Sequence, residues 1–447
     1  MSRMCAPHVL LIPYPQAGHL LSMLDLAHHL SLRGLTITVH STPENLSKLH
    51  PLISSSPTVH PLLLPLPDKS QPSNDFRDTI VAMGSLYGPI LSWAKAHPTP
   101  PVLIVSDLFL GWTRRLAEEL SVPRVVFSPS GAPSLSLTYG LWREMPKLSD
   151  DVSFPTLPNS PIYPWRQLSM LYRMYREGDP VSEFVKKGMR DNIASWGVII
   201  NSFKGMDGAY VEHLKRDLGH NQVWEAGPLN VLGIRVERAG LGPDVKGWLD
   251  GCPVGSVVYV CFGTMIELTA RQVEVIAKAL ERSGVRFLWA LKAAAASDGD
   301  LLPDGFEERT AGRGVMMRGW AAQVEILGHD AVGVFLNHCG WNSILEGVTA
   351  GVSLLAWPML ADQFFNARLV VEELGVAVMV CEGEESVPEV GELAEKVKEA
   401  VSEGGGEMGV RGRELRRKAL EAVEVGGSSY GDLDGFVGEV VKLHCLA

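Results

Sequence analysis

The sequence predicts an α/β protein with two Rossmann-like domains that face each other across a cleft. Its 447 residues are enough for two substantial domains. Both halves alternate short apolar runs, typical of buried parallel strands, with segments of helical periodicity. A weakly patterned stretch that contains Gly and Pro, at about residues 226–246, separates the halves as a linker would.

The first half opens with a strand, a turn, a helix and a second strand. Residues 8–12 (HVLLI) predict a buried strand, and PYPQAGH follows as a turn. Apolar residues at helical spacing predict a helix over 20–32, which Gly34 ends before a strand over 35–40. The pattern recurs with strands at 102–106, 124–128 and 197–201 and a helix at 113–121, whereas the stretches 51–78 and 145–167, rich in Pro and Ser, predict long loops.

The second half repeats this alternation. Strands are predicted at 256–262, 286–291, 332–336 and 352–357, and helices at 269–284, 342–350, 363–374, 388–402, 411–423 and 429–445. We therefore expect an N-terminal domain over 1–235, a C-terminal domain over 247–428 and a terminal helix within 429–447.

Composition excludes several classes of protein. A net charge of −11 argues against nucleic acid or an anionic membrane as the main partner, because both attract basic faces. The six cysteines form neither a CxxC pair nor a Cys/His cluster, which favours free thiols in a reducing compartment. No run approaches 18 apolar residues. We expect a cytoplasmic protein with no integral membrane association.

Residues 320–363 form the most informative block, WAAQVEILGHDAVGVFLNHCGWNSILEGVTAGVSLLAWPMLADQ. It contains no Lys or Arg, so any phosphate bound there must be held by neutral donors and a helix dipole. Asn342 and Ser343 are preferred N-cap residues, and amides at a helix N-terminus attract phosphate. His338 could add a donor, although an ordinary capped helix would explain the Asn and Ser equally well.

Other residues of the block have chemistry suited to a nucleotide sugar. Trp320 offers a flat face for a base, although a core tryptophan is the commoner role. Gln323 could bond a base edge or cap a turn. Glu346, on the same helix face as Asn342, could accept both hydroxyls of a ribose, and Asp362 with Gln363 could bind sugar hydroxyls. Each of these residues also has a purely structural explanation.

A candidate base lies in the other half of the chain. His19 ends the PYPQAGH turn at the positive end of a helix, which disfavours imidazolium and leaves a neutral base near pH 7. Asp107 ends a predicted strand, where a carboxylate points into the ligand crevice of such folds and could orient His19. A turn-capping His and a strand-end Asp are the structural alternatives.

The 44-residue block resembles the donor-sugar signature of plant family-1 UDP-glycosyltransferases, and the resemblance extends over nearly the whole chain. It implies the GT-B fold type, a final helix that crosses back to the first domain, and His19 with Asp107 as a catalytic dyad. It also implies that Trp320 stacks on uracil, Glu346 binds ribose, and Asp362 and Gln363 hold the sugar, with Gln363 typical of UDP-glucose. The donor residues expected from it are Gly263, Thr264, Trp320, Ala321, Gln323, His338, Trp341, Asn342, Ser343, Glu346, Asp362, Gln363 and Ser130.

In its second half, the sequence departs from the family pattern at three places, and in the first half Gln16 and Ala17 are swapped relative to the common Ala-Gln. Ala322 stands where Pro is usual, Asn337 stands where Thr or Ser is usual, and CFGT at 261–264 replaces the commoner SFGS. These changes remove none of the polar groups expected to hold the donor, although they could alter its affinity.

The expected reaction is inverting transfer of glucose from UDP-glucose to a hydroxyl of a small aromatic acceptor, such as a flavonoid or another phenolic. His19 would take the acceptor proton, and no cofactor or metal would be needed. The acids of Asp298–Asp300 are interpreted as a solvated turn and not as a metal site. We expect a monomer. Aromatic residues of the first half could line the acceptor site, or could belong to its core: Trp112, Tyr139, Trp142, Tyr163, Trp165 and Tyr172.

Two other functions are compatible with the scaffold. The first is a catalytically silent protein that binds nucleotides or small aromatics, against which the presence of both His19 and Asp107 argues. The second is a nicotinamide-dependent oxidoreductase. It is disfavoured because PYPQAGH, and not GxGxxG, follows the first strand.

Overall fold

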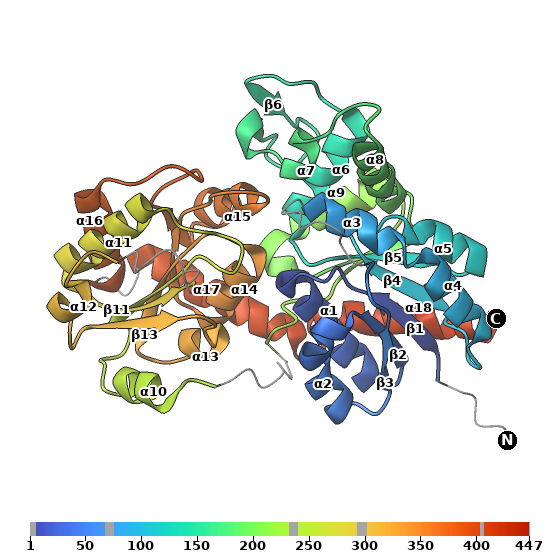
Figure 1. Cartoon of the computed structure of the whole chain (residues 1–447), viewed down its shortest axis with the longest axis horizontal. Coiled ribbons are helices and arrows are strands. Elements are labelled where there is room, and N and C mark those ends of the chain that lie inside the picture. The colour runs from blue at the N-terminus through green and yellow to red at the C-terminus, as the bar shows by residue number, and fades with distance from the viewer. Residues whose placement is uncertain (1–5, 68–75, 232–239, 293–301, 403–405, 447) are drawn as a thin grey trace. The chain divides into compact units, whose positions relative to one another are not determined.

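The computed structural model describes residues 6–67, 76–231, 240–292, 302–402 and 406–446 (Figure 1). The chain divides into two compact units. Unit 1 contains Met1–Glu237 and Glu421–Ala447, and unit 2 contains Arg238–Leu420. Each unit is built on its own parallel sheet, which confirms the predicted α/β class with two Rossmann-like domains.

Unit 1 contains a seven-stranded parallel sheet in the order β3-β2-β1-β4-β5-β8-β9. Its strands are β1 (His8–Ile12), β2 (Thr36–Ser41), β3 (Val59–Leu63), β4 (Leu103–Asp107), β5 (Arg124–Ser128), β8 (Gly197–Ile200) and β9 (Val223–Glu225). Strand order reverses between β1 and β4, so the segments that follow these two strands diverge. Ligands of doubly wound folds bind at such a point, outside the carboxyl ends of the strands.

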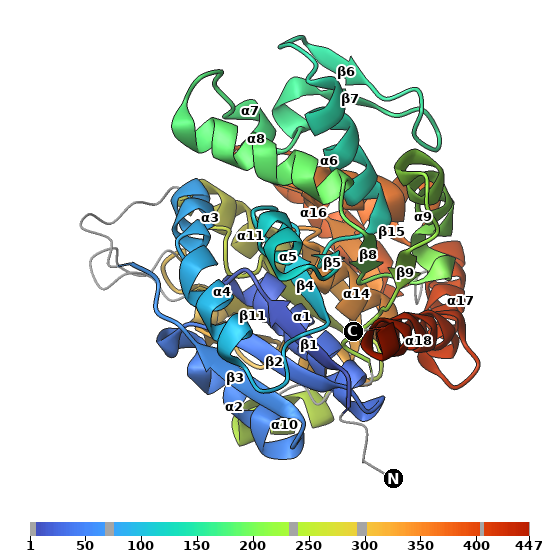
Figure 2. The same ribbon diagram turned by 90° about the vertical axis from the view of Figure 1, so that its right-hand side faces the viewer.

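Helices of unit 1 connect these strands. They are α1 (Ala17–Leu32), α2 (Leu46–Ser55), α3 (Phe76–Gly84), α4 (Tyr87–Ala96), α5 (Thr113–Leu120), α6 (Ala132–Glu144), α7 (Met170–Arg173), α8 (Pro180–Ile193), α9 (Lys204–Leu218) and α18 (Ser428–Leu446), with 3₁₀ turns η1 (Pro43–Asn45) and η2 (Trp165–Gln167). A hairpin of β6 (Asp151–Ser153) and β7 (Ile162–Pro164) lies beside α6, α7 and α8 (Figures 1 and 2).

Unit 2 contains a six-stranded parallel sheet in the order β12-β11-β10-β13-β14-β15. Its strands are β10 (Val257–Cys261), β11 (Arg286–Leu291), β12 (Gly314–Arg318), β13 (Val332–Asn337), β14 (Ser353–Ala356) and β15 (Ala377–Met379). Strand order reverses here between β10 and β13. The ligand crevice of this sheet is therefore expected where the segments after β10 and β13 begin.

Helices of unit 2 surround its sheet. They are α10 (Pro243–Asp250), α11 (Ala270–Ser283), α12 (Phe306–Arg309), α13 (Gln323–Leu327), α14 (Trp341–Ala350), α15 (Gln363–Arg368), the π-helical turn η3 (Leu369–Glu373), α16 (Val390–Ser402) and α17 (Gly406–Val423). α11 begins with a capping box, in which Thr269 and Gln272 bond each other's backbone amides. It packs along α16.

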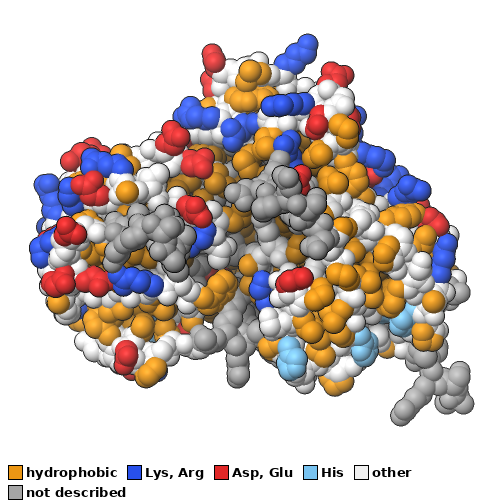
Figure 3. All heavy atoms as spheres, viewed as in Figure 1, with side chains coloured by type: hydrophobic (Ala, Val, Ile, Leu, Met, Phe, Trp, Pro, Cys, Tyr) orange, Lys and Arg blue, Asp and Glu red, His pale blue; other side chains and the backbone are white. Residues whose placement is uncertain are grey.

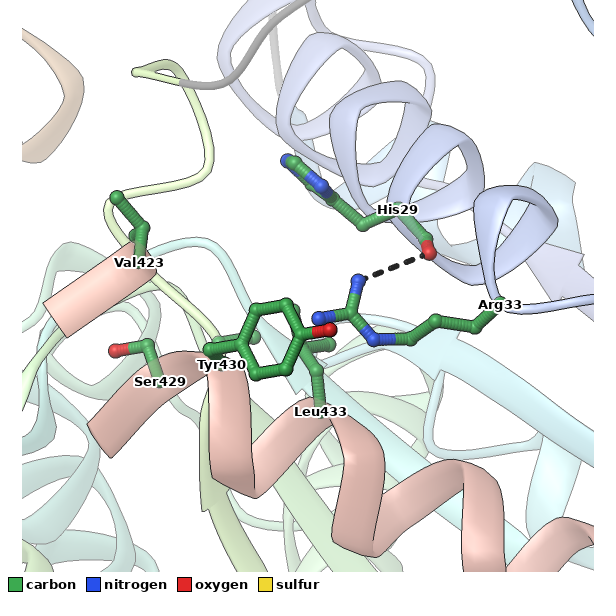
Figure 4. Close-up of a pocket in the computed structure, with 7 residues that line it drawn as sticks. His29, Arg33, Val423, Ser429, Tyr430 and Leu433 are labelled. Atoms are coloured by element: carbon green, nitrogen blue, oxygen red, sulfur yellow. Dashed lines mark hydrogen bonds between the residues drawn. The ribbon is translucent and has the colours of Figure 1, made fainter. Parts of the chain in front are cut away.

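The final helix, α18, is part of the core of unit 1. Leu433, Phe436 and Val440 are buried with residues of β1, β2 and α1. At the edge of this contact, Nε of Arg33 donates to Asp434 at 2.8 Å, and its guanidinium lies 4.7 Å from the ring centre of Tyr430. Figure 4 shows Arg33 reaching back to the carbonyl of His29 beside Tyr430 and Leu433.

Replacing Phe436 with Ala is expected to lower the free energy of unfolding of unit 1 by about 3–5 kcal/mol, because it leaves a cavity under α18. Urea denaturation followed by tryptophan fluorescence measures the change. Val441→Ala removes a half-exposed side chain of the same helix and should cost less than about 0.5 kcal/mol. Equal losses for the two variants would show that α18 contributes little to the core.

Several expected boundaries were wrong. Residues 51–78 include the end of α2, strand β3 and the start of α3, and residues 145–167 contain the β6–β7 hairpin. Both stretches are rich in proline. Pro61 is tolerated because β3 is an edge strand, whereas Pro51 lies inside α2, where it removes one backbone hydrogen-bond donor. α1 begins at Ala17, so His19 is already helical. Asp298–Asp300 and part of the expected linker lie outside the described residues.

Charges of both signs are interspersed on the face that Figure 3 shows. Among the described residues, no helix is both long and apolar enough to span a bilayer. The same part of the chain holds no group of three or more His, Cys, Asp or Glu side chains arranged to bind a metal ion.

Acid is expected to destabilise the protein. Burial lowers the pKa of His29, His40 and His338 from 6.5 to about 4. Between these pH values the three imidazoles stay neutral in the folded protein, whereas they take up protons in the unfolded protein. Their contribution to stability is complete above pH 6.5 and is lost as the pH falls toward 4. Glu225 acts in the opposite direction, because burial raises its pKa from 4.5 to about 8 and its contribution is lost as the pH rises between these values.

Urea midpoints measured across this range test the effect. The wild type should lose stability between about pH 6.5 and pH 4.5. His40→Leu should lose less over the same interval, because it removes one of the buried imidazoles. A variant that follows the wild-type curve would show that His40 titrates normally in the folded protein.

Candidate active site

His19 and Asp107 come together at the strand-order reversal of unit 1. His19 lies in the first turn of α1, after β1, and Asp107 is the last residue of β4. Nδ1 of His19 donates to Oδ2 of Asp107 at 2.8 Å. Asp107 is fully buried, whereas the side chain of His19 is 18% exposed. Because Nδ1 carries the proton that Asp107 accepts, the neutral ring has its lone pair on Nε2.

Aromatic side chains fix the plane of the His19 ring. Phe109 stacks on it at 4.8 Å between ring centres, and Tyr14 meets it edge-on at 5.4 Å. The backbone amide of Phe109 also donates to Oδ1 of Asp107 at 2.9 Å. Both carboxylate oxygens of Asp107 therefore accept hydrogen bonds, and one short segment contacts His19 twice. Sequence reasoning did not select Phe109, although its position two residues after Asp107 was a signal.

Ser130 lies in the bend between β5 and α6, also at the carboxyl edge of this sheet. Its carbonyl accepts a hydrogen bond from the hydroxyl of Ser128 at 2.9 Å. The amide of Ala132, at the start of α6, donates to the buried carboxylate of Asp207 at 2.7 Å. These bonds fix the backbone on both sides of Ser130.

The acceptor aromatics expected from the sequence belong mainly to the core. The side chains of Trp112, Tyr139, Trp142, Tyr163 and Tyr172 are buried, and only Trp165 of the set is partly exposed. Trp142 packs edge-on against Tyr172. Of the two explanations for these residues, the structure therefore supports packing.

In unit 2, the segments that follow β10 and β13 meet. Gly263, after β10, has a φ of 73°, and a Cβ atom there would lie 2.7 Å from Cε1 of His338. A Cβ on Gly340 would lie 2.5 Å from Nε2 of the same ring. Only glycine fits at both positions, so the imidazole is enclosed between two stretches of bare backbone. Thr264 follows with an exposed side chain.

Burial keeps His338 neutral. Although His338 as a whole residue is partly exposed, desolvation of its ring lowers its pKa to about 4, and its Nδ1 atom is buried without a hydrogen-bond partner among the described residues. A neutral imidazole carries one N–H group and can donate a hydrogen bond without adding positive charge. Buried polar atoms without protein partners are uncommon and occur at functional sites.

The helix after His338 starts earlier than the sequence suggests. Its N-cap is Gly340, so Trp341, Asn342 and Ser343 occupy the first turn of α14 and the expected Asn and Ser caps are not observed. Glycine has no side chain to accept bonds from the amides of this turn. Asn337 caps the preceding turn by accepting from the amide of Cys339 at 2.7 Å.

Gln323, expected at the base, links the residues expected at the ribose and at the phosphates. Its amide nitrogen donates to Glu346 at 2.6 Å and to the hydroxyl of Ser343 at 3.1 Å. Its oxygen accepts from the hydroxyl of Tyr259 at 3.3 Å, which fixes the orientation of the amide. Tyr259, in β10, was not foreseen because nothing in its local sequence distinguishes it from a core residue.

Trp320 and Ala321 lie just before α13. Trp320 is 53% exposed, so the commoner role of tryptophan as a core residue is excluded for it. Ala322 is buried at the N-cap of α13, where the family pattern has Pro. An exposed indole three residues before Gln323 is suited to stacking on a flat base.

Asp362 and Gln363 lie at the start of α15. The oxygen of the Gln363 side chain accepts from the amides of Met359 and Leu360, at 2.9 and 3.0 Å, so its NH₂ group remains to donate. Nδ2 of Asn366 donates to Asp362 at 3.1 Å and to the carbonyl of Cys339 at 3.0 Å. Asn366 thus connects the start of α15 to the loop before α14, and sequence reasoning did not select it.

The chain is similar to known glycosyltransferases over almost its full length. The family model "UDP-glucoronosyl and UDP-glucosyl transferase" matches residues 236–400. UDP-glycosyltransferase 89B2 of Stevia rebaudiana is 48% identical, over 96% of this chain and 97% of that protein. Flavonol 3-O-glucosyltransferase UGT89B1 of Arabidopsis thaliana is 46% identical, over 98% of this chain and 96% of that protein.

A solved structure supports the same relationship. Arabidopsis thaliana UGT89C1 complexed with UDP-L-rhamnose has a TM-score of 0.81 and 37% identity, and covers 97% of this chain and 99% of that chain. The same Arabidopsis protein has also been solved with quercetin. These similarities, together with the two sheets and the residues gathered at their reversal points, show that the chain belongs to the plant family-1 UDP-glycosyltransferases.

Proposed function

We propose that this enzyme transfers glucose from UDP-glucose to a hydroxyl of a small phenolic acceptor, such as a flavonol, with inversion at the anomeric carbon. The observation that carries the mechanism is the bond between Nδ1 of His19 and Asp107, which leaves Nε2 of a partly exposed ring able to take a proton. A phenol needs such a base, because its hydroxyl is largely protonated at neutral pH.

The proposed step transfers one proton and exchanges one bond. Nε2 of His19 takes the acceptor proton as the acceptor oxygen forms a bond to the anomeric carbon. The bond from that carbon to the β-phosphate oxygen breaks, and its electron pair leaves with UDP. Asp107 stabilises the imidazolium that forms. The first-turn amides of α14 and the neutral His338 stabilise the charge that develops on the diphosphate.

Two observations support glucose as the transferred sugar. Gln363 matches the residue that goes with UDP-glucose in the family, and its side chain is oriented to donate a hydrogen bond. The 46% identical Arabidopsis relative is a glucosyltransferase by name. The 37% identical UGT89C1 was solved with UDP-L-rhamnose, so rhamnose is the competing donor.

A screen of donors against acceptors tests this proposal. UDP-glucose, UDP-galactose and UDP-L-rhamnose are each offered with flavonols and simple phenols, and the products are identified by mass and by hydrolytic stability. We expect O-glucosides of phenols from UDP-glucose, formed equally well with a metal chelator present. A preference for UDP-L-rhamnose would refute the donor assignment, and no product from any pair would favour the silent binding protein.

The proposal also includes a monomeric enzyme that acts in the cytoplasm without a cofactor. Light scattering of the purified protein and imaging of a fluorescent fusion test the first two points. The chelator arm of the screen tests the third.

A further inference from the structure

Arg124 is a buried cation beside the strand that carries Asp107. It begins β5, pairs in register with Ile104 of β4, and is 2% exposed. Burial lowers its pKa to about 10, so it remains charged at neutral pH, and the nearby acids Asp107 and Asp191 favour that charge. Burying a guanidinium is costly, and a fold that retains one usually uses its hydrogen-bonding fork.

Within the described residues, the guanidinium of Arg124 donates to hydroxyls and a carbonyl, and to no carboxylate. Nε lies 2.9 Å from the hydroxyl of Ser106 and 2.8 Å from that of Thr113. Nη1 donates to the hydroxyl of Ser195 at 2.7 Å, and Nη2 lies 3.4 Å from the carbonyl of Leu110. Neutral acceptors stabilise a buried charge less than a carboxylate would. We therefore interpret these bonds as fixing the positions of the groups that accept them.

Three of these contacts fall on a single segment, residues 106–113. Ser106 immediately precedes Asp107, and Thr113 opens α5. The hydroxyl of Thr113 also donates to the carbonyl of Leu110 at 2.6 Å, so Arg124 holds both ends and the middle of the segment. Between these points lie Asp107 and Phe109, the two residues that fix His19.

Other contacts of the same segment come from α8. Nδ2 of Asn192 donates to the carbonyl of Leu108 at 2.5 Å. A Cβ on Gly111 would lie 1.9 Å from the carbonyl oxygen of Gly188, so the backbones touch there. The segment is therefore held along its length, and the guanidinium of Arg124 bonds three of its residues.

We propose that Arg124 is a positioning residue for sugar transfer, which holds the Asp107–Phe109 segment so that His19 keeps the orientation of a base. This inference rests on the proposed function. Arg124 acts through the segment and does not touch the substrates. Displacing a base by about 1 Å can cost about 100-fold in rate, so loss of the anchor should affect chemistry far more than donor binding.

The test compares two acceptors that differ in their need for a base. One is a simple phenol, protonated at the assay pH, and the other is a nitrophenol that is already largely ionised. Arg124→Met should lower kcat about 100-fold with the phenol and less than about tenfold with the nitrophenol. KM for the UDP-sugar should change little. Arg124→Lys keeps the charge and part of the hydrogen bonding, and should recover part of the loss.

A second variant keeps the test informative if Arg124→Met does not fold. Thr113→Val removes the hydroxyl that joins Arg124 to Leu110 with little change in volume, and should give the same dependence on acceptor, at about tenfold. Leu49→Ala is the matched control. Leu49 is buried in α2, which packs on β3, and bonds to no residue of the 106–113 segment in the contacts above, so this change should affect both acceptors equally.

The inference is overturned if Arg124→Met and Thr113→Val lower activity with both acceptors by the same factor, or leave it unchanged. His19→Ala separates this outcome from a failure of the proposed function. If His19→Ala keeps full activity with the simple phenol, the proposed base is wrong. If it loses that activity while the Arg124 variants keep theirs, only the role of Arg124 is refuted.

Discussion

Replacing His19 with Ala is expected to lower kcat for a simple phenol by about 10²–10⁴-fold, the range over which a positioned base accelerates proton transfer. The expectation comes from the hydrogen bond between Nδ1 and the buried Asp107 and from the stacked Phe109. Together these contacts fix the orientation of the ring and of its Nε2 atom. UDP binding should not change, because the residues proposed to hold the diphosphate belong to unit 2.

Steady-state kinetics with two acceptors and calorimetry with UDP measure these two effects. An ionised nitrophenol should retain much more of its rate in the variant, because it needs no base. His28→Ala, on the same helix but turned toward Ser56, controls for the loss of any α1 histidine and should keep wild-type kcat. If His19→Ala weakened UDP binding as much as it slowed transfer, a structural role for His19 would explain the result better.

The parts of the fold that sequence predicts best are short apolar strands. β1, β5 and β11 begin and end at the expected residues, because a buried parallel strand is apolar throughout and a turn follows it. β3 was missed, since it lies at the sheet edge, contains Pro61 and buries only two of its five residues. The start of α1 was misplaced because its cap, Gln16, is not a residue that usually marks a helix N-terminus.

Candidate site residues were located by spacing, but their partners were not. The pattern of the 44-residue block selects Gln323, Ser343 and Glu346 separately, whereas the structure joins them through one amide group. In the sequence, Tyr259 resembles a core residue and Arg124 resembles an exposed charge at a strand end, and only contacts between distant segments reveal what they hold. Long-range side-chain contacts of this kind leave no periodic signal in the sequence.

Replacing His338 with Ala is expected to lower kcat at saturating donor by about 10²–10³-fold, the usual cost of removing one donor that stabilises developing charge. His338 is enclosed by Gly263 and Gly340 at the start of α14, and burial lowers its pKa to about 4. A neutral N–H group placed there can bond the diphosphate more strongly as UDP leaves, because the charge on its oxygens rises in the transition state.

Kinetics at several pH values distinguish this account from a simple ionic attraction. With a pKa of about 4, the imidazole is neutral from pH 6 to pH 8, so the loss caused by His338→Ala should be constant over that range. An imidazolium of ordinary pKa would give a loss that grows as the pH falls. His329→Ala, a matched change in unit 2 at a histidine whose Nε2 lies 3.2 Å from Oδ1 of Asp250, should leave kcat unchanged.

The division of the effect between kcat and KM then identifies what His338 does. A rise in KM with unchanged kcat would mean that the imidazole binds donor and transition state equally, and the proposed stabilisation of the leaving group would be wrong. A fall in kcat with unchanged KM is the expected result. It would assign to one neutral ring, held between two glycines, the work that a lysine or a metal ion performs at other diphosphate sites, in a 44-residue block that contains neither Lys nor Arg.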